Sequence, residues 1–136
     1  FIGKGVYQRL CEIYEQYGYV LDETDSIKYS GLNAMSEMNA AVERMREKKI
    51  TSIGIHTVSG IRDYLSGVRT SADGETALDI KGVNCVYYEL LSGGFICLRP
   101  SGTEPKLKFY LTAWDKHEKN SSEFVEKMTD FIKTQV

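Results

Sequence analysis

The segment VNCVYYELLSGGFICLRPSGTEPKLKFYLTAW, residues 83–114, contains three apolar stretches separated by two turn sequences. The turns are SGG at residues 92–94 and RPSGTEP at residues 99–105, and the stretches around them are rich in β-branched and aromatic residues. Such stretches, joined by short turns that contain Gly or Pro, are typical of antiparallel strands. The segment therefore predicts a three-stranded antiparallel meander, and this meander decides the fold class.

Three helices are predicted around the meander. Apolar residues at three- and four-residue spacing indicate a helix over residues 6–17, with Gly18 as its stop, and a second helix over residues 32–45. A third, terminal helix is predicted where Asn120 and Glu123 form a capping-box pattern.

Two further strands complete the predicted sheet. Residues 19–31 indicate an extended segment or edge strand, and a second strand is expected around residues 56–64. The polar, Gly-containing residues 65–82 predict a flexible loop. Because the strands are grouped and the helices lie elsewhere along the chain, we expect an α+β fold: an antiparallel four- to five-stranded sheet with helices on one face.

The composition limits the possible classes of protein. With 136 residues, 42% hydrophobic residues, 26% charged residues and a net charge of −2, the chain is typical of one globular domain with no nucleic-acid partner. No apolar run reaches the roughly 18 to 20 residues of a membrane span, so no membrane partner is expected. The chain begins without Met or a signal peptide, and we interpret it as a piece of a longer cytoplasmic protein.

The cysteines and histidines show no pattern of a metal site or a disulfide framework. The three cysteines are Cys11, Cys85 and Cys97. Their odd number and wide spacing favour buried free thiols in a reducing cytosol, and pairing about the turn at residues 92–94 places Cys97 opposite Glu89. Because His56 and His117 lie far apart with no further ligand at metal spacing, we expect no metal site. No nucleophile–base pair stands out, so no catalytic residue is predicted.

Two cations flank the second turn and are the main candidates for binding an anion. The planar guanidinium of Arg99 can hold two phosphate oxygens at once, whereas Lys108 offers a single movable charge. Lys108 alternates with Leu107 and Phe109, so it should project to the opposite face of its strand.

The turn itself adds polar donors. Ser101 and Thr103 carry hydroxyl groups, and Gly102 tolerates the φ with which successive N–H groups converge on an anion. Lys106 is a weaker candidate, and Glu104 is expected to point away because its carboxylate would repel a phosphate. Composition alone leaves open that the segment is an ordinary turn, since turns are rich in these residue types.

The stretch YYELLSGGFICLRPSGTEPKLKFYL, residues 87–111, closely resembles the C-terminal phosphate-binding segment of the α-D-phosphohexomutases, particularly the phosphoglucomutase and phosphomannomutase branch. The resemblance extends more weakly over the whole chain. It implies that residues 19–136 are the family's C-terminal (fourth) domain, a sheet-and-helix unit of TBP-like fold, and that residues 1–18 are a lead-in helix from the preceding domain.

The resemblance also implies a role for the second turn. Arg99, Ser101, Gly102 and Thr103 would hold the phosphate of the substrate sugar, and Lys108 stands where relatives carry Arg or Lys. The parent enzyme would be an intramolecular phosphotransferase that interconverts hexose 1-phosphate and 6-phosphate through a bisphosphorylated intermediate. The turn would hold the phosphate that is not reacting. Mg²⁺ and hexose 1,6-bisphosphate are expected as cofactors of the full-length enzyme.

Three other motifs of that family do not occur in this chain: the loop with the phosphorylatable serine, the Asp-rich Mg²⁺ loop and the sugar-binding loop. The chain alone is therefore expected to be inactive, with a hexose phosphate and the other domains of the same protein as its partners. A free-standing phosphate-binding or interaction module without catalysis is the alternative, and the missing initiator Met argues against it. A DNA-binding TBP-like domain is disfavoured, because a net charge of −2 provides no basic face for the DNA backbone.

Overall fold

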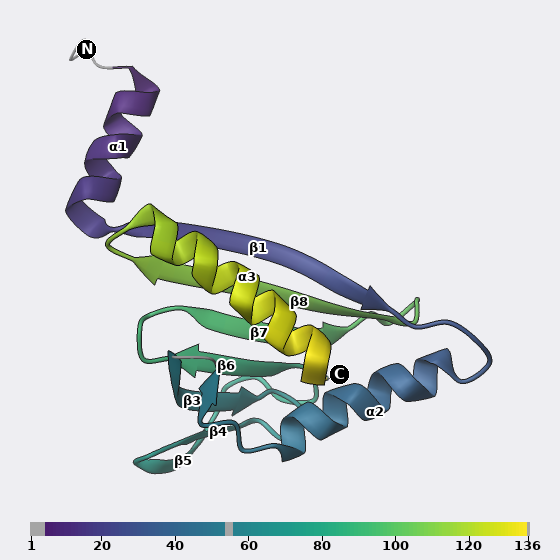
Figure 1. Ribbon diagram of the computed structural model, residues 1–136. Helices are drawn as coiled ribbons and strands as arrows, with labels where there is room; N and C mark the ends of the chain where they lie inside the picture. Colours follow the sequence, from purple (N-terminus) through teal and green to yellow (C-terminus); the bar gives the residue numbers. More distant parts are fainter. Residues whose placement is uncertain (1–4, 54–55, 136) are drawn as a thin grey trace.

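The structure is a computed structural model that describes residues 5–53 and 56–135. Within these ranges the chain forms three helices, α1 (Val6–Tyr17), α2 (Ala34–Glu47) and α3 (Glu118–Gln135). The described strands are β1 (Tyr19–Lys28), β2 (Ser52–Ile53), β3 (His56–Asp63), β4 (Val68–Ser71), β5 (Gly74–Ala77), β6 (Val86–Leu90), β7 (Phe95–Pro100) and β8 (Lys106–Asp115). The predicted order of helix, strand, helix, four strands and helix is confirmed in the sequence of element types (Figure 1), but seven described strands rather than four lie between α2 and α3.

Strands β6, β7 and β8 form the predicted antiparallel meander. Leu90 pairs with Gly94 across a three-residue turn that ends at Gly93, whose φ of 96° suits glycine. This turn is centred one residue earlier than the SGG sequence suggests. The register therefore places Cys97 opposite Tyr87, and the predicted pairing of Cys97 with Glu89 is wrong.

The sheet is wider than the predicted four to five strands. Its order is β1-β8-β7-β6-β3-β4-β5, with β2 paired to β3, so the predicted edge strand β1 does lie at an edge. The additional strands β4 and β5 come from residues 65–82, which were expected to be a flexible loop. Ser71 and Gly74 close this hairpin, and because all of β5 is exposed, no buried alternating pattern marks it in the sequence.

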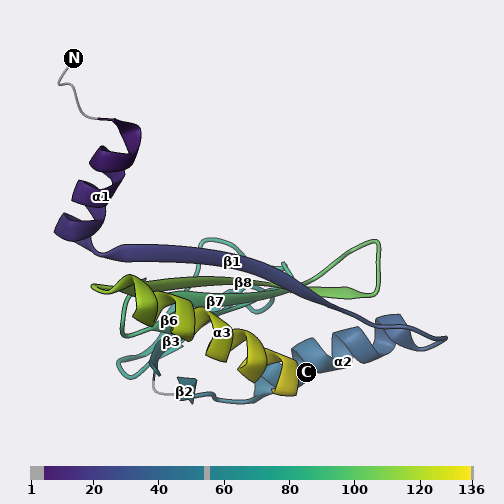
Figure 2. The ribbon, with the colours of Figure 1, turned by 45° about the horizontal axis from the view of Figure 1, so that its top comes forward.

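Helices α2 and α3 cover one face of the sheet, as predicted for the α+β class (Figure 2). Residues of β6, β7 and β8 alternate between buried and partly exposed, since successive strand residues point to opposite faces. The buried ones join residues of both helices in a single core, whose largest fully buried side chains include Tyr88, Phe109, Met38 and Met45. No helix covers the other face in the described part of the chain, and we call it the open face.

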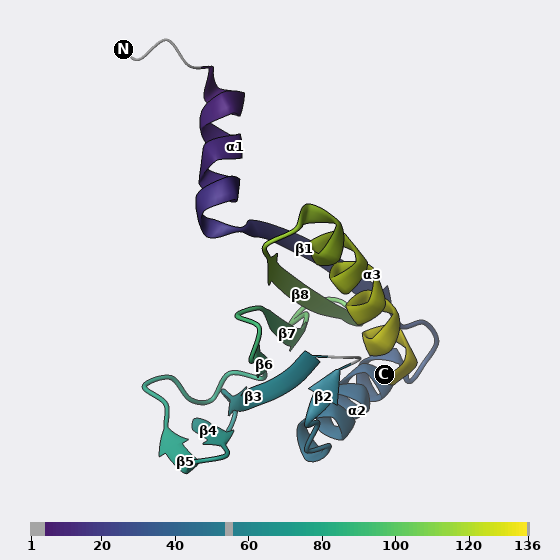
Figure 3. The same ribbon diagram turned by 60° about the vertical axis from the view of Figure 1, so that its left-hand side comes forward.

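Helix α1 stands apart from this core. It begins and ends where the spacing predicts, with Gly18 following it at a φ of 92°, but it has no buried residue. Figure 3 shows α1 extending away from the sheet. None of the described helices has the length and apolar character needed to cross a membrane.

Helix α3 starts earlier than the predicted capping box. Asn120 lies inside the helix, and its side-chain amide donates to Asp115 Oδ1 at 2.9 Å. The same carboxylate oxygen accepts the backbone N–H of His117 at 2.8 Å. Asp115 is therefore the acceptor at this helix start, a role that we assigned to Asn120 from the sequence.

Candidate functional site

The predicted phosphate-binding turn, residues 101–105, connects β7 to β8 at one end of the meander. Arg99 and Lys108 are direct cross-strand partners at this end. Their strand neighbours Leu98, Leu107 and Phe109 are buried in the core, so both cations project from the open face. The structure thus brings the two predicted cations together.

Two further lysines extend this cationic cluster. Lys106 lies two residues before Lys108 on the same face of β8, and its cross-strand partner is Lys28 on β1. Lys28 was missed from the sequence, because no local signal connects β1 to β8. We define the cationic corner as Lys28, Arg99, Lys106 and Lys108.

No carboxylate forms a salt bridge with the cationic corner within the described residues, although the charge of Lys106 acts on Asp25. Among the described residues, none of its four side chains forms a hydrogen bond or salt bridge. Asp25 on β1 forms its salt bridge with Lys133 of α3 at 2.8 Å. Like charges placed directly opposite in a sheet repel each other, so a bound anion would relieve an existing strain at this corner.

A depression of about 300 Å³ lies beside the cationic corner. It is lined by Thr24, Asp25, Ser26, Lys106, Lys108 and Tyr110. Ser26 is the cross-strand partner of Lys108, so the two side chains lie on the same face of the sheet. The depression is large enough for a phosphate group, and Lys106 and Lys108 line it. Its lining residues do not include Arg99 or residues 101–103 of the turn, so the depression adjoins the predicted site without coinciding with it.

The backbone of the turn differs from the predicted anion-binding row. The N–H of Ser101 donates to the carbonyl oxygen of Lys106 at 2.8 Å, which removes it from the predicted set of donors. Gly102 is not among the described glycines with positive φ, so the conformational reason given for a glycine there is wrong. The N–H groups of Gly102 and Thr103 donate to no backbone acceptor in the described part of the chain. Glu104 is exposed and forms no salt bridge with Lys106 among these residues.

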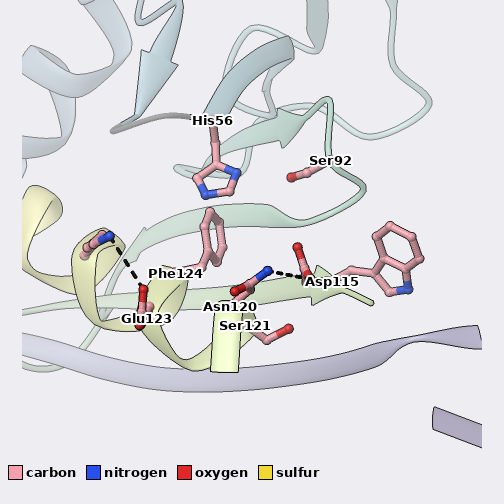
Figure 4. A pocket seen from close by; sticks show the side chains of 9 residues that line it. His56, Ser92, Asp115, Asn120, Ser121, Glu123 and Phe124 are labelled. Atoms are coloured by element: carbon pink, nitrogen blue, oxygen red, sulfur yellow. Dashed lines mark hydrogen bonds and ion pairs between the residues drawn. The ribbon is translucent and has the colours of Figure 1, made fainter. Parts of the chain in front are cut away.

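A second cavity, of about 220 Å³, lies on the helix-covered side at the start of α3 (Figure 4). The His56 ring meets Phe124 edge to face with ring centroids 4.0 Å apart, and burial lowers the pKa of this histidine. Several other polar groups here are paired: Asn120 donates to Asp115, and Ser121 Oγ donates to the Tyr19 carbonyl oxygen at 3.2 Å. These bonds fix the start of α3 and leave few groups for a ligand.

Neither location provides a metal centre within the described residues. No group of three or more His, Cys, Asp and Glu side chains in that part of the chain could hold a metal ion. Mg²⁺ prefers six oxygen ligands in near-octahedral geometry, and the cationic corner would repel it. We therefore assign no metal ligand to this chain.

Comparisons with known proteins agree on one group of enzymes. No family model matches the chain. The phosphoglucomutase of Staphylococcus haemolyticus is 34% identical to it over 112 residues, which are 81% of this chain and 20% of that enzyme. The phosphoglucomutase of Staphylococcus saprophyticus is 35% identical over 103 residues, which are 74% of this chain and 18% of that enzyme. The chain thus spans about a fifth of the length of these relatives, and the match falls in their C-terminal region.

A solved structure supports the fold. The exocytosis-sensitive phosphoprotein pp63/parafusin of Paramecium, described as a phosphoglucomutase in an open form, superposes with a TM-score of 0.52. The superposition covers 94% of this chain and 22% of the Paramecium protein at 11% sequence identity. At this identity the likeness shows a shared fold alone, which is the α+β arrangement predicted from the sequence.

Proposed function

The chain is homologous to the C-terminal region of phosphoglucomutases, and from this premise we propose that it is the phosphate-binding domain of such an enzyme. In this proposal Arg99, Ser101, Gly102, Thr103 and Lys108 bind the non-reacting phosphate of a hexose phosphate. The observation that carries the proposal is the position of Arg99 opposite Lys108, with neither cation in a salt bridge within the described part of the chain.

Each residue has a separate part in this binding. Arg99 fixes the orientation of the phosphate through two parallel N–H donors, and Lys108 adds charge from the neighbouring strand. Ser101 contributes only its hydroxyl, because its N–H is bonded to Lys106. Gly102 and Thr103 contribute N–H groups, and Thr103 adds a second hydroxyl.

The proposed enzyme converts hexose 1-phosphate into hexose 6-phosphate and back through a bisphosphorylated intermediate. That intermediate must bind in two flipped orientations, and a site that contacts only a phosphate group serves both. Mg²⁺ and hexose 1,6-bisphosphate belong to this proposal for the full-length enzyme. A cytoplasmic location is also part of it, which the three free cysteines support.

No catalytic group is assigned to this chain, so the purified chain should not turn over glucose 1-phosphate. Its part of the proposal is binding, and inorganic phosphate is the simplest probe. We expect a dissociation constant on the order of millimolar, because a small exposed site makes few contacts to offset the cost of association.

The test is a phosphate titration followed by backbone amide NMR shifts. The amides of Gly102 and Thr103 should move first, and Arg99→Gln should shift their titration to about tenfold higher phosphate. Lys116→Ala is the matched control: it removes one exposed positive charge just beyond the other end of β8 and should leave the titration unchanged. Equal effects of the two replacements would show non-specific attraction and contradict the proposal.

A further inference from the structure

Two cysteines lie side by side on the open face. Cys85 immediately precedes β6, Cys97 lies in β7, and their Sγ atoms are 3.3 Å apart. All three cysteines are free thiols, as predicted, but only Cys85 is buried, while Cys97 and Cys11 are partly exposed. The predicted burial of the thiols therefore holds for Cys85 alone.

The register of the sheet explains this proximity. Cys97 of β7 is opposite Tyr87 of β6. Cys85 lies two residues before Tyr87, so its side chain is on the same face of the sheet and diagonal to Cys97. Such diagonal neighbours have Cβ atoms roughly 7 Å apart or less, and a favourable twist brings their side chains together. A disulfide has an S–S length of about 2.05 Å and Cβ atoms roughly 3.5–4.5 Å apart, so both side-chain rotation and an approach of the two chain segments are needed to form the bond.

The surroundings give the two sulfurs different properties. The hydrogen bond between the two thiols lowers the pKa of Cys85 against the opposing effect of burial, and the charge of Arg99 lowers this pKa further. The same hydrogen bond, together with burial, raises the pKa of Cys97. Cys85 is therefore the sulfur that more readily becomes a thiolate, and Cys97 is the one that keeps its proton.

We propose that Cys85 and Cys97 are a modification site that forms a reversible disulfide with hydrogen peroxide as the oxidant. The Cys85 thiolate attacks one peroxide oxygen, the O–O bond breaks, and a water molecule leaves after protonation of the departing oxygen. Cys85 is then a sulfenic acid. The Cys97 sulfur attacks the Cys85 sulfur, the S–O bond breaks, and the hydroxide leaves as water with the Cys97 proton.

In total, two thiols and one peroxide give one disulfide and two water molecules, and the sulfurs lose two electrons to the two peroxide oxygens. Reduction by a small thiol restores the starting state. Disulfides in reducing compartments are commonly transient and redox-sensing, which fits a pair on a face that no described helix covers. The reaction does not depend on the proposed phosphate site, although Arg99 acts electrostatically on both thiols.

The test uses the full 136-residue chain, in which trypsin cleavage places Cys11 on a different peptide from Cys85 and Cys97. Trypsin cleaves after Lys81 and Lys106 but not at the Arg99–Pro100 bond, so Cys85 and Cys97 share one peptide and Cys11 lies in another. The folded chain is treated with hydrogen peroxide, remaining thiols are blocked with N-ethylmaleimide, and the peptides are weighed. The shared peptide should lose two hydrogen atoms and take up no label, and dithiothreitol should restore two labelled thiols.

Three variants define the outcome. Cys11→Ser should form the disulfide as the unaltered chain does, which excludes a link through α1. Cys85→Ser and Cys97→Ser should each leave a single thiol in the shared peptide. This thiol should either gain oxygen or react with N-ethylmaleimide, and no intramolecular disulfide should form. The amide NMR spectrum of each reduced variant verifies that it is folded. If the shared peptide of the folded, unaltered chain still takes up two labels after peroxide treatment, or if the cysteines link different molecules, the proposal is wrong.

Discussion

The side-chain directions in β8 show which residues of the candidate site can be placed from the sequence alone. Strand alternation predicts Lys108 on the opposite face from Leu107 and Phe109, and both of the latter are buried while Lys108 remains partly exposed. Lys28 could not be predicted in the same way. It reaches the cationic corner through the pairing of β1 with β8, a contact between distant parts of the chain that no local pattern encodes.

Arg99 should contribute more to phosphate binding than Lys108. A charge-assisted hydrogen bond contributes about 1.5–3 kcal/mol, and solvent exposure reduces this toward the lower limit, so Arg99→Ala should raise the dissociation constant about tenfold. Lys108→Ala should raise it about threefold, because water replaces a single exposed charge more easily. Arg99→Lys should restore part of the affinity, since it keeps the charge without the planar fork. Titration of the three variants measures this ordering, and full recovery with lysine would contradict it.

Tyr88 is a buried residue whose role is structural. Its side chain is 0% exposed, and its hydroxyl donates to the carbonyl oxygen of Met45 in α2 at 2.7 Å. Tyr88→Phe leaves this carbonyl without its partner, so it should lower the free energy of unfolding by about 1–2 kcal/mol at neutral pH. Urea unfolding measures the loss. Tyr17→Phe, at a residue that is 62% exposed, is the control and should change stability by less than about 0.5 kcal/mol.

The same variant should behave differently in alkaline solution. Burial raises the pKa of Tyr88 in the folded chain. In the unfolded chain this tyrosine has an ordinary pKa of about 10, so near that pH the unfolded chain loses a proton that the folded chain keeps. The unfolded state then binds fewer protons, and stability falls by up to about 1.4 kcal/mol per pH unit for this group as pH rises. Tyr88→Phe lacks this contribution. The stability difference between the two proteins should therefore shrink above about pH 10, and a constant difference would argue against a buried, protonated Tyr88.

At the scale of elements, the sequence predicts the strands in which buried and partly exposed residues alternate, and it can miss strands that lack this alternation. The meander is recognisable because Val86, Tyr88 and Leu90 alternate with partly exposed residues and glycines mark the first turn. The hairpin of β4 and β5 has no such pattern. The start of α3 was misplaced for a different reason, since the acceptor Asp115 belongs to the preceding strand and the capping-box pattern lies inside the helix.

Two glycines that flank β7 should differ in how much stability they lose on replacement by alanine. A Cβ at Gly94 would collide with the backbone carbonyl oxygen of Thr112, which cannot move without disturbing β8. Gly94→Ala should therefore destabilise the fold by roughly 2 kcal/mol or more. A Cβ at Gly102 would meet nothing within 4 Å, so Gly102→Ala should change stability by less than about 0.5 kcal/mol.

Thermal unfolding distinguishes these two outcomes. Gly102→Ala also retains the backbone N–H that we assign to phosphate binding, so its affinity for phosphate should stay within about twofold of the unaltered chain. A large loss of stability in Gly102→Ala would show that the turn at residues 101–105 requires a glycine conformation after all.

At the scale of the whole molecule, α2 and α3 share one core with the sheet, whereas α1 remains outside it. The amphipathic spacing of α1 predicts a helix with an apolar face, but it contains no information on what covers that face. Val6, Tyr7 and Tyr17 are 90%, 76% and 62% exposed, respectively. This arrangement fits the proposal that residues 1–18 lead in from a preceding domain and that residues 19–136 form the phosphate-binding domain.

Deletion of residues 1–16 tests that division. The shortened chain keeps the Tyr17 carbonyl oxygen, which accepts the indole N–H of Trp114 at 2.9 Å, and loses the stacking of Tyr14 on Tyr19, whose ring centroids are 4.8 Å apart. An aromatic pair contributes about 0.5–1.5 kcal/mol, so stability should fall by no more than about 1.5 kcal/mol, and unfolding should remain one cooperative transition. Phe124→Ala in α3 is the contrasting variant and should cost about 3 kcal/mol or more, because Phe124 packs in the core. If the deletion proved as damaging as Phe124→Ala in urea unfolding, α1 would be an integral part of the domain and the boundary near Gly18 would be wrong.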